Sequence, residues 1–498
     1  MTAAVVRPFV ALAIALAIAG CSIPAKPDRP ILRNEAPLAG VDVPAGAAWP
    51  ETEWWKRYAD AQLDELEAKA LAGAPTLDEA HKRFDTAIRS IESARAASAL
   101  SSQLNGEVQR NRLSQTLGLP AGVAPVWYNL GELNVQFQYD FDFWGKTRAA
   151  VQAAVDEARA SEAERSAAAL VLTTAVADTY FGWQADQARL ALAKQNGTTL
   201  ARYRELSAKR VARGVDQPDS LHEAEERVAA TREVEAGYEG SAAIRRAALA
   251  ALLGIAPAQL PTLQALPLPN VEAALPDNVG LDLIARRPDI AANRWRVEAA
   301  MQRVEQVRAE FYPDISLGAM AGVQTLDLDK MFNLDSRTLG FGPAVHLPLF
   351  QRAQLHAAYG VSQAQLQTAA SQYDAAVVDA ARDVSTQALT LRQIDARRQA
   401  RAEQIVAAEK LHDAVAARVR HGLGDDRSVL VAASEVLQQR DAAATLQAQA
   451  ISTDIALTKA LGGGYRVPEA STDGAAGAAG AAASSSTPPN SAQRADSR

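Results

Sequence analysis

The chain has 498 residues, of which 51 are basic and 58 acidic, so its formal net charge is −7. This balance argues against a protein that mainly binds nucleic acid, because such proteins usually carry a basic face or tail. A single cysteine excludes a disulfide framework or a thiolate metal cage within one chain, and only 5% aromatic residues favour thin, alanine-rich cores between long helices.

The N-terminus predicts a lipoprotein signal peptide. Arg7 supplies a positive region, and Phe9 to Ala19 form an apolar run of eleven residues, which suits a signal-peptide core and is too short to cross a bilayer. The run ends in Ile18-Ala19-Gly20-Cys21, which resembles a bacterial lipoprotein box. We expect Cys21 to carry diacylglycerol after cleavage; the alternative is an ordinary signal peptide with a stray cysteine. Ser22, rather than an acidic residue, favours the outer membrane by similarity to known lipoproteins.

Both ends of the mature chain are expected to lack a compact fold. Six prolines fall between Ser22 and Pro50, which indicates an extended tether. The C-terminal end is rich in Ala, Gly and Ser and should be disordered. The predicted organisation is a signal peptide (1–20), a lipid-anchored proline-rich tether (21–50), a first repeat (51–262), a second repeat (263–467) and a disordered tail (468–498).

Long stretches without proline predict two helical arms of matching length. Lys146 to Arg213 span 68 residues and Gln351 to His421 span 71, so each arm would be roughly 100 Å long. A glycine-containing break follows each arm, and a helix of about 35 residues then returns. Gly214 and Gly422 in the breaks are 208 residues apart, as are the glycines that end the returning helices, which indicates a tandem duplication.

The second arm also carries a heptad pattern. Small and apolar residues recur at coiled-coil spacing at Leu366, Ala370, Tyr373, Val377, Ala380, Val384, Gln387, Leu391 and Ile394. An antiparallel coiled coil inside a compact bundle would give the same pattern. The length of the arm argues against that alternative, because a compact domain is seldom so wide.

Alternating residues predict at least three strands. From Glu132 to Phe143 one face carries Leu133, Val135, Phe137, Tyr139, Phe141 and Phe143, and the other carries polar residues that include Gln136, Gln138, Asp140 and Asp142. Ile315 to Val323 and Leu339 to Leu349 alternate in a similar way, and Leu104 to Leu113 is a weaker candidate. A half-buried sheet would also alternate. Strands near ten residues with terminal aromatics nevertheless suit a membrane.

Four strands cannot close a membrane barrel, which needs about eight, and lipid does not tolerate an open edge. Either the sheet lies outside the membrane, or several chains pool their strands. Two chains would supply eight strands and three would supply twelve, and only the larger barrel leaves a wide aqueous lumen. The polar face of the longest strand would suit such a wet interior.

Several motifs resemble the TolC-like outer-membrane factor family, specifically its lipoprotein branch that serves resistance-nodulation-division efflux pumps. The matching pieces are Trp54-Trp55, Ala74-Pro75-Thr76-Leu77, Asp142 to Lys146, Ala285-Arg286-Arg287-Pro288-Asp289-Ile290 and Phe311-Tyr312-Pro313-Asp314-Ile315-Ser316-Leu317. The resemblance covers about Cys21 to Gly464. It implies a mainly α fold with a membrane β-barrel: a homotrimer with a twelve-stranded barrel in the outer membrane and a twelve-helix coiled-coil tunnel in the periplasm. Leu133, Val135, Phe137, Tyr139 and Phe141 would then face lipid.

The resemblance also implies partners and a function. Members are passive ducts that dock through a periplasmic adaptor onto an energised inner-membrane pump, and we expect this chain to export drugs or other small toxic compounds in that way. The alternatives are a periplasmic coiled-coil scaffold lipoprotein without a pore, and a duct for type I protein secretion. The sequence carries no phosphate-binding loop, no nucleophile elbow and no histidine pair at i, i+4, so we expect no enzyme activity, no metal and no cofactor besides the lipid on Cys21.

The resemblance places the tips of the helical hairpins at Arg210 to Gly214 and Arg418 to Gly422. In the family, acidic residues just beyond the second tip glycine ring the pore, where repeated carboxylates attract cations. This sequence departs from that pattern, because Ser428 and Val431 occupy the expected positions. The candidates for an aperture or an adaptor contact are instead Gly214, Asp216, Gly422, Asp425 and Asp426, with simple solvated turns as the alternative.

Overall fold

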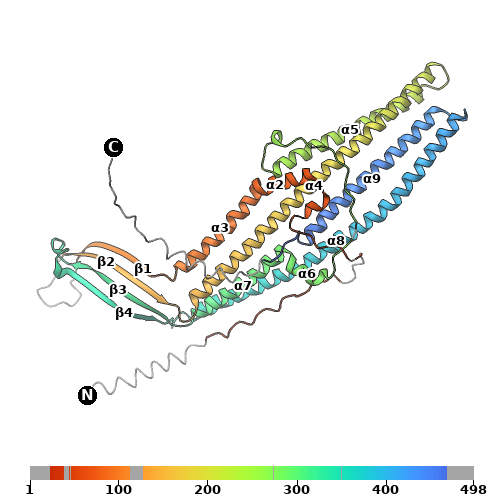
Figure 1. Ribbon diagram of the computed structural model, residues 1–498. Coiled ribbons are helices and arrows are strands. Elements are labelled where there is room, and N and C mark those ends of the chain that lie inside the picture. The colour runs from red at the N-terminus through yellow and green to blue at the C-terminus, as the bar shows by residue number, and fades with distance from the viewer. Residues whose placement is uncertain are drawn as a thin grey trace, which may run out of the picture.

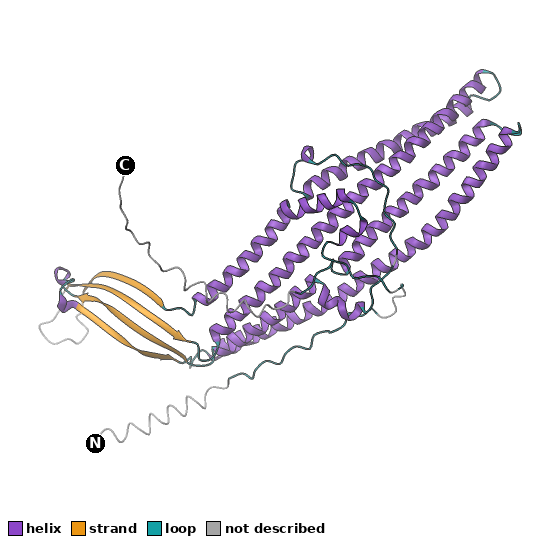
Figure 2. Ribbon diagram, viewed as in Figure 1, coloured by secondary structure: helices purple, strands orange, loops and turns teal. Residues whose placement is uncertain are grey.

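In the computed structural model, residues 23–38, 44, 46–112, 127–272, 274–348 and 350–467 are described. A four-stranded sheet lies at one end, and long helices run away from it to two hairpin tips at the other (Figure 1). The strands are confined to the sheet end, and helices form the rest of the body (Figure 2). The predicted signal peptide, Cys21 and the predicted tail lie outside the described residues.

The sheet is antiparallel, and its strands follow their order along the chain. They are β1 (Ser101–Arg112), β2 (Trp127–Phe141), β3 (Asp314–Thr325) and β4 (Arg337–His346). The three stronger predictions and the weak one are all confirmed as strands. β1 forms despite its weak pattern because pairing with β2 along its whole length satisfies the backbone of that edge.

Several strand ends differ from the prediction: β2 begins at Trp127, five residues before the predicted Glu132, and β1, β3 and β4 each begin one to three residues early. β2 ends at Phe141 rather than Phe143, because the N–H of Phe143 turns back to the carbonyl oxygen of Phe141 at 3.0 Å. β4 ends at His346, two residues before Pro348, which has no N–H to donate to a ladder. The predicted ends at Leu113 and Leu349 lie outside the described residues.

The two predicted arms are confirmed to within one residue at each end. They are α4 (Lys146–Ala212, 67 residues) and α8 (Arg352–Arg420, 69 residues), which return as α5 (Asp219–Leu252) and α9 (Asp426–Ala460). The shorter helices are α2 (Ala61–Gly73), α3 (Pro75–Ala96), α6 (Val279–Arg286) and α7 (Pro288–Ala309), with 3₁₀ turns η1 (Trp54–Tyr58), η2 (Pro257–Gln259), η3 (Leu328–Lys330) and η4 (Leu334–Ser336). Among the residues described, no helix combines the length and apolar character that crossing a membrane requires.

The helices bury one shared apolar core. α4 packs against α3, α5, α7 and α9, and α8 packs against α7 and α9. The predicted seam of α8 is buried except at Gln387, which is only partly covered, while Ala388 is buried in its place. Ile394, one heptad after Gln387, is buried again, so the seven-residue repeat continues past this position.

The proline-rich segment is fastened to the body. Within residues 23–38, Arg29 pairs with Glu298 of α7 at 3.2 Å. The hydroxyl of Tyr373 on α8 donates to the carbonyl oxygen of Arg33 at 3.0 Å. These contacts hold an extended segment along two helices, which the prediction of an extended tether did not include.

Candidate functional site

Each hairpin tip reverses through a glycine with a left-handed backbone. Gly214 has a φ of 69° and Gly422 a φ of 75°, values that only glycine adopts cheaply. At the first tip, the N–H of Gly214 bonds to the carbonyl oxygen of Val211 at 2.9 Å, and that of Val215 bonds to Arg210 at 3.0 Å. The tip of the second hairpin has the same two backbone hydrogen bonds at the equivalent positions. Both helices therefore end in a Schellman motif, which fixes where the chain can turn.

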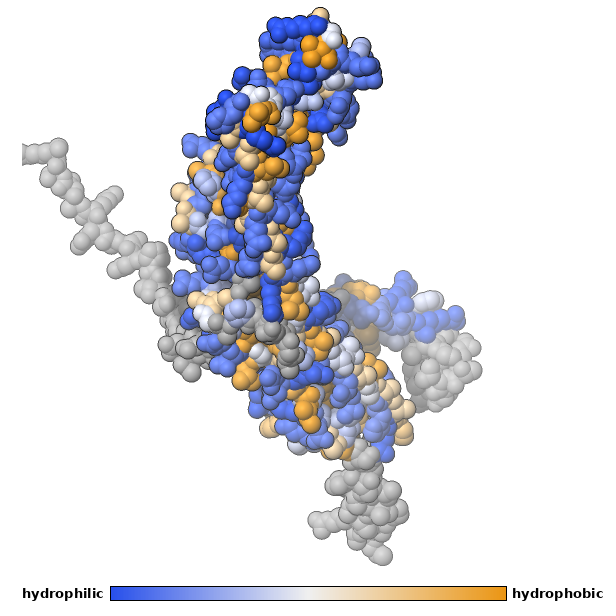
Figure 3. Space-filling model, turned by 90° about the vertical axis from the view of Figure 1, so that its right-hand side faces the viewer, coloured by the Kyte–Doolittle hydropathy of each residue, from blue (hydrophilic) through white to orange (hydrophobic). Residues whose placement is uncertain are grey.

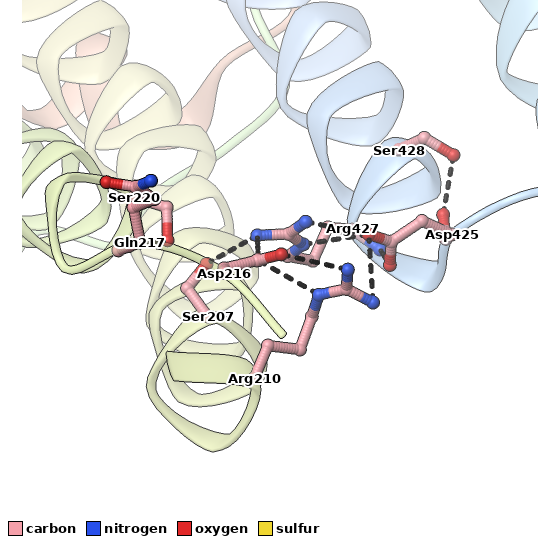
Figure 4. Close-up of polar contacts among 8 residues, drawn as sticks. All are labelled: Ser207, Arg210, Asp216, Gln217, Ser220, Asp425, Arg427 and Ser428. Atoms are coloured by element: carbon pink, nitrogen blue, oxygen red, sulfur yellow. Dashed lines mark hydrogen bonds and ion pairs between the residues drawn. The ribbon is translucent and has the colours of Figure 1, made fainter. Parts of the chain in front are cut away.

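The two tips are joined by four charged side chains, Arg210, Asp216, Asp425 and Arg427, which we call the tip cluster (Figure 4). Arg210 of α4 makes a bidentate pair with Asp216, with both N–O distances 2.9 Å. Arg427 of α9 lies 2.7 Å from Asp216 and 2.9 Å from Asp425. Arg210 also reaches Asp425 at 3.7 Å. The cluster thus binds the first hairpin to the second through two cations and two anions.

These contacts change the acidity of both carboxyl groups. Hydrogen bonding from Arg210 holds the pKa of Asp216 below its usual value, and the charge of Arg427 adds to this. Burial acts to raise the pKa of Asp425, but hydrogen bonds from the backbone and side chain of Arg427 outweigh it, so the pKa is lowered. Both groups are therefore ionised at neutral pH. The cluster as a whole is neutral and adds little negative potential to the tip.

The structure separates the two neighbouring acids that the sequence grouped together. Asp425 is the N-cap of α9, where its side chain accepts a hydrogen bond from the N–H of Arg427 at 3.1 Å. Asp426 begins the helix and points into solvent, and no ion pair to it is found among the described residues. Arg427, only 17% exposed, was missed by the sequence reasoning, although its place two residues after Asp425 was a signal for this local pair.

A second polar link joins the hairpins further from the tips. Arg189 of α4 makes a bidentate pair with Asp441 of α9, at 2.9 and 3.1 Å, and donates to the hydroxyl of Tyr238 on α5 at 2.6 Å. A cavity of about 420 Å³ lies beside it, between α4, α5 and α9. The sequence gave no signal for this link, because its members are 49 to 252 residues apart.

One buried carboxyl group lies far from both links. Glu67 of α2 is fully buried, and neither of its side-chain oxygens has a hydrogen-bond partner among the described residues. Burial, with a smaller contribution from the charge of Asp64, raises its pKa from 4.5 to about 9. Glu67 is therefore protonated at neutral pH.

This raised pKa predicts a pH-dependent stability. Between about pH 5 and 9 the folded chain keeps a proton on Glu67 that the unfolded chain has lost, so stability should fall as pH rises through that window. Glu67→Gln, which is always neutral, should raise Tm by a few degrees at pH 8 and by much less at pH 5. Glu65→Gln, on the exposed side of the same helix, is the matched control. Equal Tm differences at both pH values would contradict the assignment.

The predicted lipid-facing residues share one face of the sheet. Phe137 is paired with Ala319 of β3, so the apolar side chains of neighbouring strands stand side by side. Phe137, Tyr139 and Phe141 are each about 40% exposed, whereas Leu133 and Val135 are partly covered. By contrast, the helices present a mostly hydrophilic surface with small, scattered apolar groups (Figure 3).

Aromatic rings stand at both ends of this apolar face. At the helical end, Trp144 stacks on Tyr312 with a centroid separation of 4.6 Å, and its Nε1 donates to the carbonyl oxygen of Pro313 at 2.8 Å. At the far end stands Trp127, which is 56% exposed. Apolar surface between two rings of aromatic residues is typical of strands that cross a membrane.

The opposite face of the sheet is polar and hollowed. A cavity of about 380 Å³ lies over it, lined chiefly by side chains that include Gln103, Gln136 and Gln138. Polar side chains also bond to one another across the strands, as where Asn105 of β1 donates to Asn134 of β2 at 3.4 Å. One sheet therefore offers an apolar surface to one side and a concave, hydrogen-bonded surface to the other.

The chain is similar to known outer-membrane proteins over most of its length. The family model for outer membrane efflux proteins matches residues 66–255 and 281–463. The multidrug resistance outer membrane protein MdtP of Shigella flexneri is 30% identical over 460 residues, which covers 90% of this chain and 94% of that protein. MdtQ of Escherichia coli O157:H7 is 30% identical over 467 residues, covering 91% and 96%.

Solved structures agree with these matches. The outer membrane protein VceC of Vibrio cholerae is 33% identical and aligns with a TM-score of 0.73, over 84% of this chain and all of that one. The outer-membrane channel OprN aligns with a TM-score of 0.79 at 23% identity, over 88% of this chain and 99% of that one. The second likeness shows the fold alone.

Proposed function

The chain belongs to the outer membrane efflux protein family, and from that membership we propose that it is the exit duct of a tripartite efflux system. In this proposal it carries drugs or other small toxic compounds passively from the periplasm, or from an inner-membrane pump, to the exterior. The relatives MdtP and MdtQ are named for multidrug resistance, which supports this substrate class.

The observation that carries the proposal is the two-faced sheet with open edges. Within the described chain, β1 and β4 each pair on one side only. An apolar sheet face in lipid needs every strand edge paired, so the sheet has to be completed by other chains. We infer a homotrimer in which β1 of one chain pairs with β4 of the next. Twelve strands then enclose a lumen lined by the polar face.

The dimensions of β2 fit this inference. Trp127 and Tyr139, both aromatic residues on the apolar face, are twelve residues apart, which is about 40 Å along a strand. At the usual tilt near 40° this spans about 30 Å, the thickness of the hydrocarbon core. The helical arms, each about 100 Å long, would continue the duct into the periplasm as a twelve-helix tunnel. The repeated order of two strands, a long arm and a returning helix favours a tandem duplication.

The fastened N-terminal segment supports lipidation at Cys21. Arg308, near the end of α7, donates to the carbonyl oxygen of Pro24 at 3.0 Å, and β3 begins only six residues later. Pro24 is three positions after Cys21 along the chain, a reach of about 10 Å. A lipid on Cys21 would therefore insert beside the helical end of the sheet, in the periplasmic leaflet of the outer membrane.

Removal of the thiol tests the lipid anchor. Cys21→Ser should abolish incorporation of labelled palmitate and loosen attachment to the membrane, while trimers still form because the barrel inserts by itself. Ser22→Ala, one residue away, should keep the label. Label that persists in Cys21→Ser would show that lipid is attached elsewhere.

At the far end of the tunnel, the tips would meet the periplasmic adaptor. Gly214 and Gly422 set the turns, Asp216 and Asp425 are engaged in the tip cluster, and Asp426 remains available to a partner. We propose that Asp426 contacts the adaptor, and that Asp216 and Asp425 hold the two tips together. Because Asp216 and Asp425 are both paired with arginines, Asp426 is the one candidate of the three acids that could line an aperture as a free carboxylate.

A measurement of single-channel conductance distinguishes a duct from a scaffold without a pore. The purified chain should run as a trimer in native mass spectrometry and give discrete single-channel currents in planar bilayers. A coiled-coil scaffold lipoprotein without a pore would give no current at any protein concentration. Trimers without conductance, under conditions where the outer-membrane channel OprN conducts, would overturn the proposed function.

A further inference from the structure

We propose that the outer rim of the sheet holds a phosphate group of the glycolipid in the outer leaflet of the outer membrane, through Arg110 and Arg112 placed against Trp127. This inference rests on the proposed membrane-spanning sheet. It adds a binding site that the duct function itself does not require.

The three side chains are brought together by the β1–β2 pairing. Arg110 is opposite Asn129 and Arg112 is opposite Trp127. The guanidinium carbons of Arg110 and Arg112 lie 5.6 and 5.9 Å from the centre of the Trp127 ring. Residues two apart on a strand point to the same face, so both arginines share the face of Leu104, which is opposite Val135. That is the apolar face of the sheet.

Two like charges held around one ring repel each other unless an anion lies between them. No carboxylate among the described residues forms an ion pair with Arg110 or Arg112. The nearest acid on β1, Glu107, is an odd number of residues away and lies on the polar face, where Gln109 donates to it. A guanidinium held beside an aromatic ring by a cation–π contact can still use its N–H edge, and that edge matches a phosphate in a bidentate geometry. The missing counter-charge therefore has the chemistry of a phosphate.

The position of the pair identifies which lipid supplies the phosphate. Trp127 marks the end of the apolar face farthest from the helices, about one hydrocarbon thickness from Tyr139. With the helices in the periplasm, this end meets the headgroups of the outer leaflet. The glycolipid of that leaflet bears phosphate esters on its sugars, whereas phospholipid headgroups lie at the opposite interface.

The loop between β3 and β4 offers apolar surface at the same end of the sheet (Figure 1). Leu328 packs over Gly131 on the apolar face, where a Cβ atom would lie 2.7 Å from its Cδ2. Phe332 and Leu334 of this loop are 81% and 71% exposed. Acyl chains of the glycolipid can pack against this surface while the arginine pair holds the phosphate.

The test is a binding measurement on the full-length trimer. Detergent-purified protein is titrated with bisphosphorylated lipid A, with dephosphorylated lipid A and with phosphatidylglycerol, and bound lipid is counted by native mass spectrometry. Wild type should prefer bisphosphorylated lipid A over both other lipids. The double variant Arg110→Gln with Arg112→Gln should bind it at least about tenfold more weakly, because it loses charge-assisted hydrogen bonds.

Lys330→Gln is the matched control. It removes one cation from the same end of the sheet, but Lys330 is already paired with Asp327 at 3.0 Å, so lipid A binding should stay as in wild type. Equal lipid A affinity in wild type and in the double variant would overturn the site. Equal binding of phosphatidylglycerol by wild type would overturn the assignment to the outer-leaflet glycolipid.

Conductance of the same preparations separates this inference from the proposed function. If wild type conducts and the double variant still binds lipid A normally, only the arginine site is wrong. If wild type does not conduct, the duct itself fails. A double variant that forms conducting trimers but loses lipid A shows that the loss is not a folding defect.

Discussion

Leu133→Arg should prevent most of the chain from assembling in the outer membrane. Leu133 lies midway between Trp127 and Tyr139, at the level proposed for the centre of the bilayer. An arginine on the lipid face at that depth costs about 2–4 kcal/mol per strand, and a homotrimer would bear this cost three times. Trimer yield in purified outer membranes measures the effect.

Gln136→Arg is the control for this variant. Gln136 lies three residues along the same strand but on the polar face, where it lines the hollow of the sheet. Its replacement should leave trimer yield unchanged and alter only conductance or ion selectivity. If Leu133→Arg assembles as well as Gln136→Arg, the apolar face does not contact lipid.

Arg210→Ala combined with Arg427→Ala should uncouple the two hairpin tips. Without these cations, Asp216 and Asp425 would face each other with no counter-charge, although both hairpins keep their Schellman turns. The long helical contacts lie elsewhere, so trimers should still form. We expect a severalfold higher resting conductance, and reduced drug resistance if the adaptor requires braced tips.

Arg420→Ala provides the comparison for the double variant. Arg420 ends α8 at the same tip, is exposed, and forms no ion pair among the described residues. Its loss removes a similar charge without touching the tip cluster, so conductance and resistance should match wild type. Identical conductance in all three proteins would show that the cluster does not hold the tips.

The long elements could be predicted from the sequence because their signals are local. Helical arms need only an absence of proline and a repeat of small apolar residues, and both arms were predicted to within one residue at each end. Strict alternation fixed β2, since the side-chain period of a strand is two. The tip glycines were predictable because a tight reversal between helices needs a positive φ.

Features that depend on distant pairs could not be predicted in this way. β1 has a weak pattern and becomes a strand through its partner β2. Gln387 stands at a heptad position but is only partly covered, while its neighbour Ala388 is buried, because burial depends on which helices pack against α8. Glu67 looks like any helix-surface acid, yet packing buries it completely.

The candidate sites show the same division between local and distant signals. The sequence by itself determined which face of β2 is apolar and where the chain turns at the tips. Only the tertiary structure decided that Arg427 reaches Asp216 of the other hairpin, and that Arg110, Arg112 and Trp127 meet at one rim. The physical reason is that periodicity and backbone conformation are properties of neighbouring residues. Two charged side chains that are far apart in the chain form an ion pair only when the fold brings their helices or strands together.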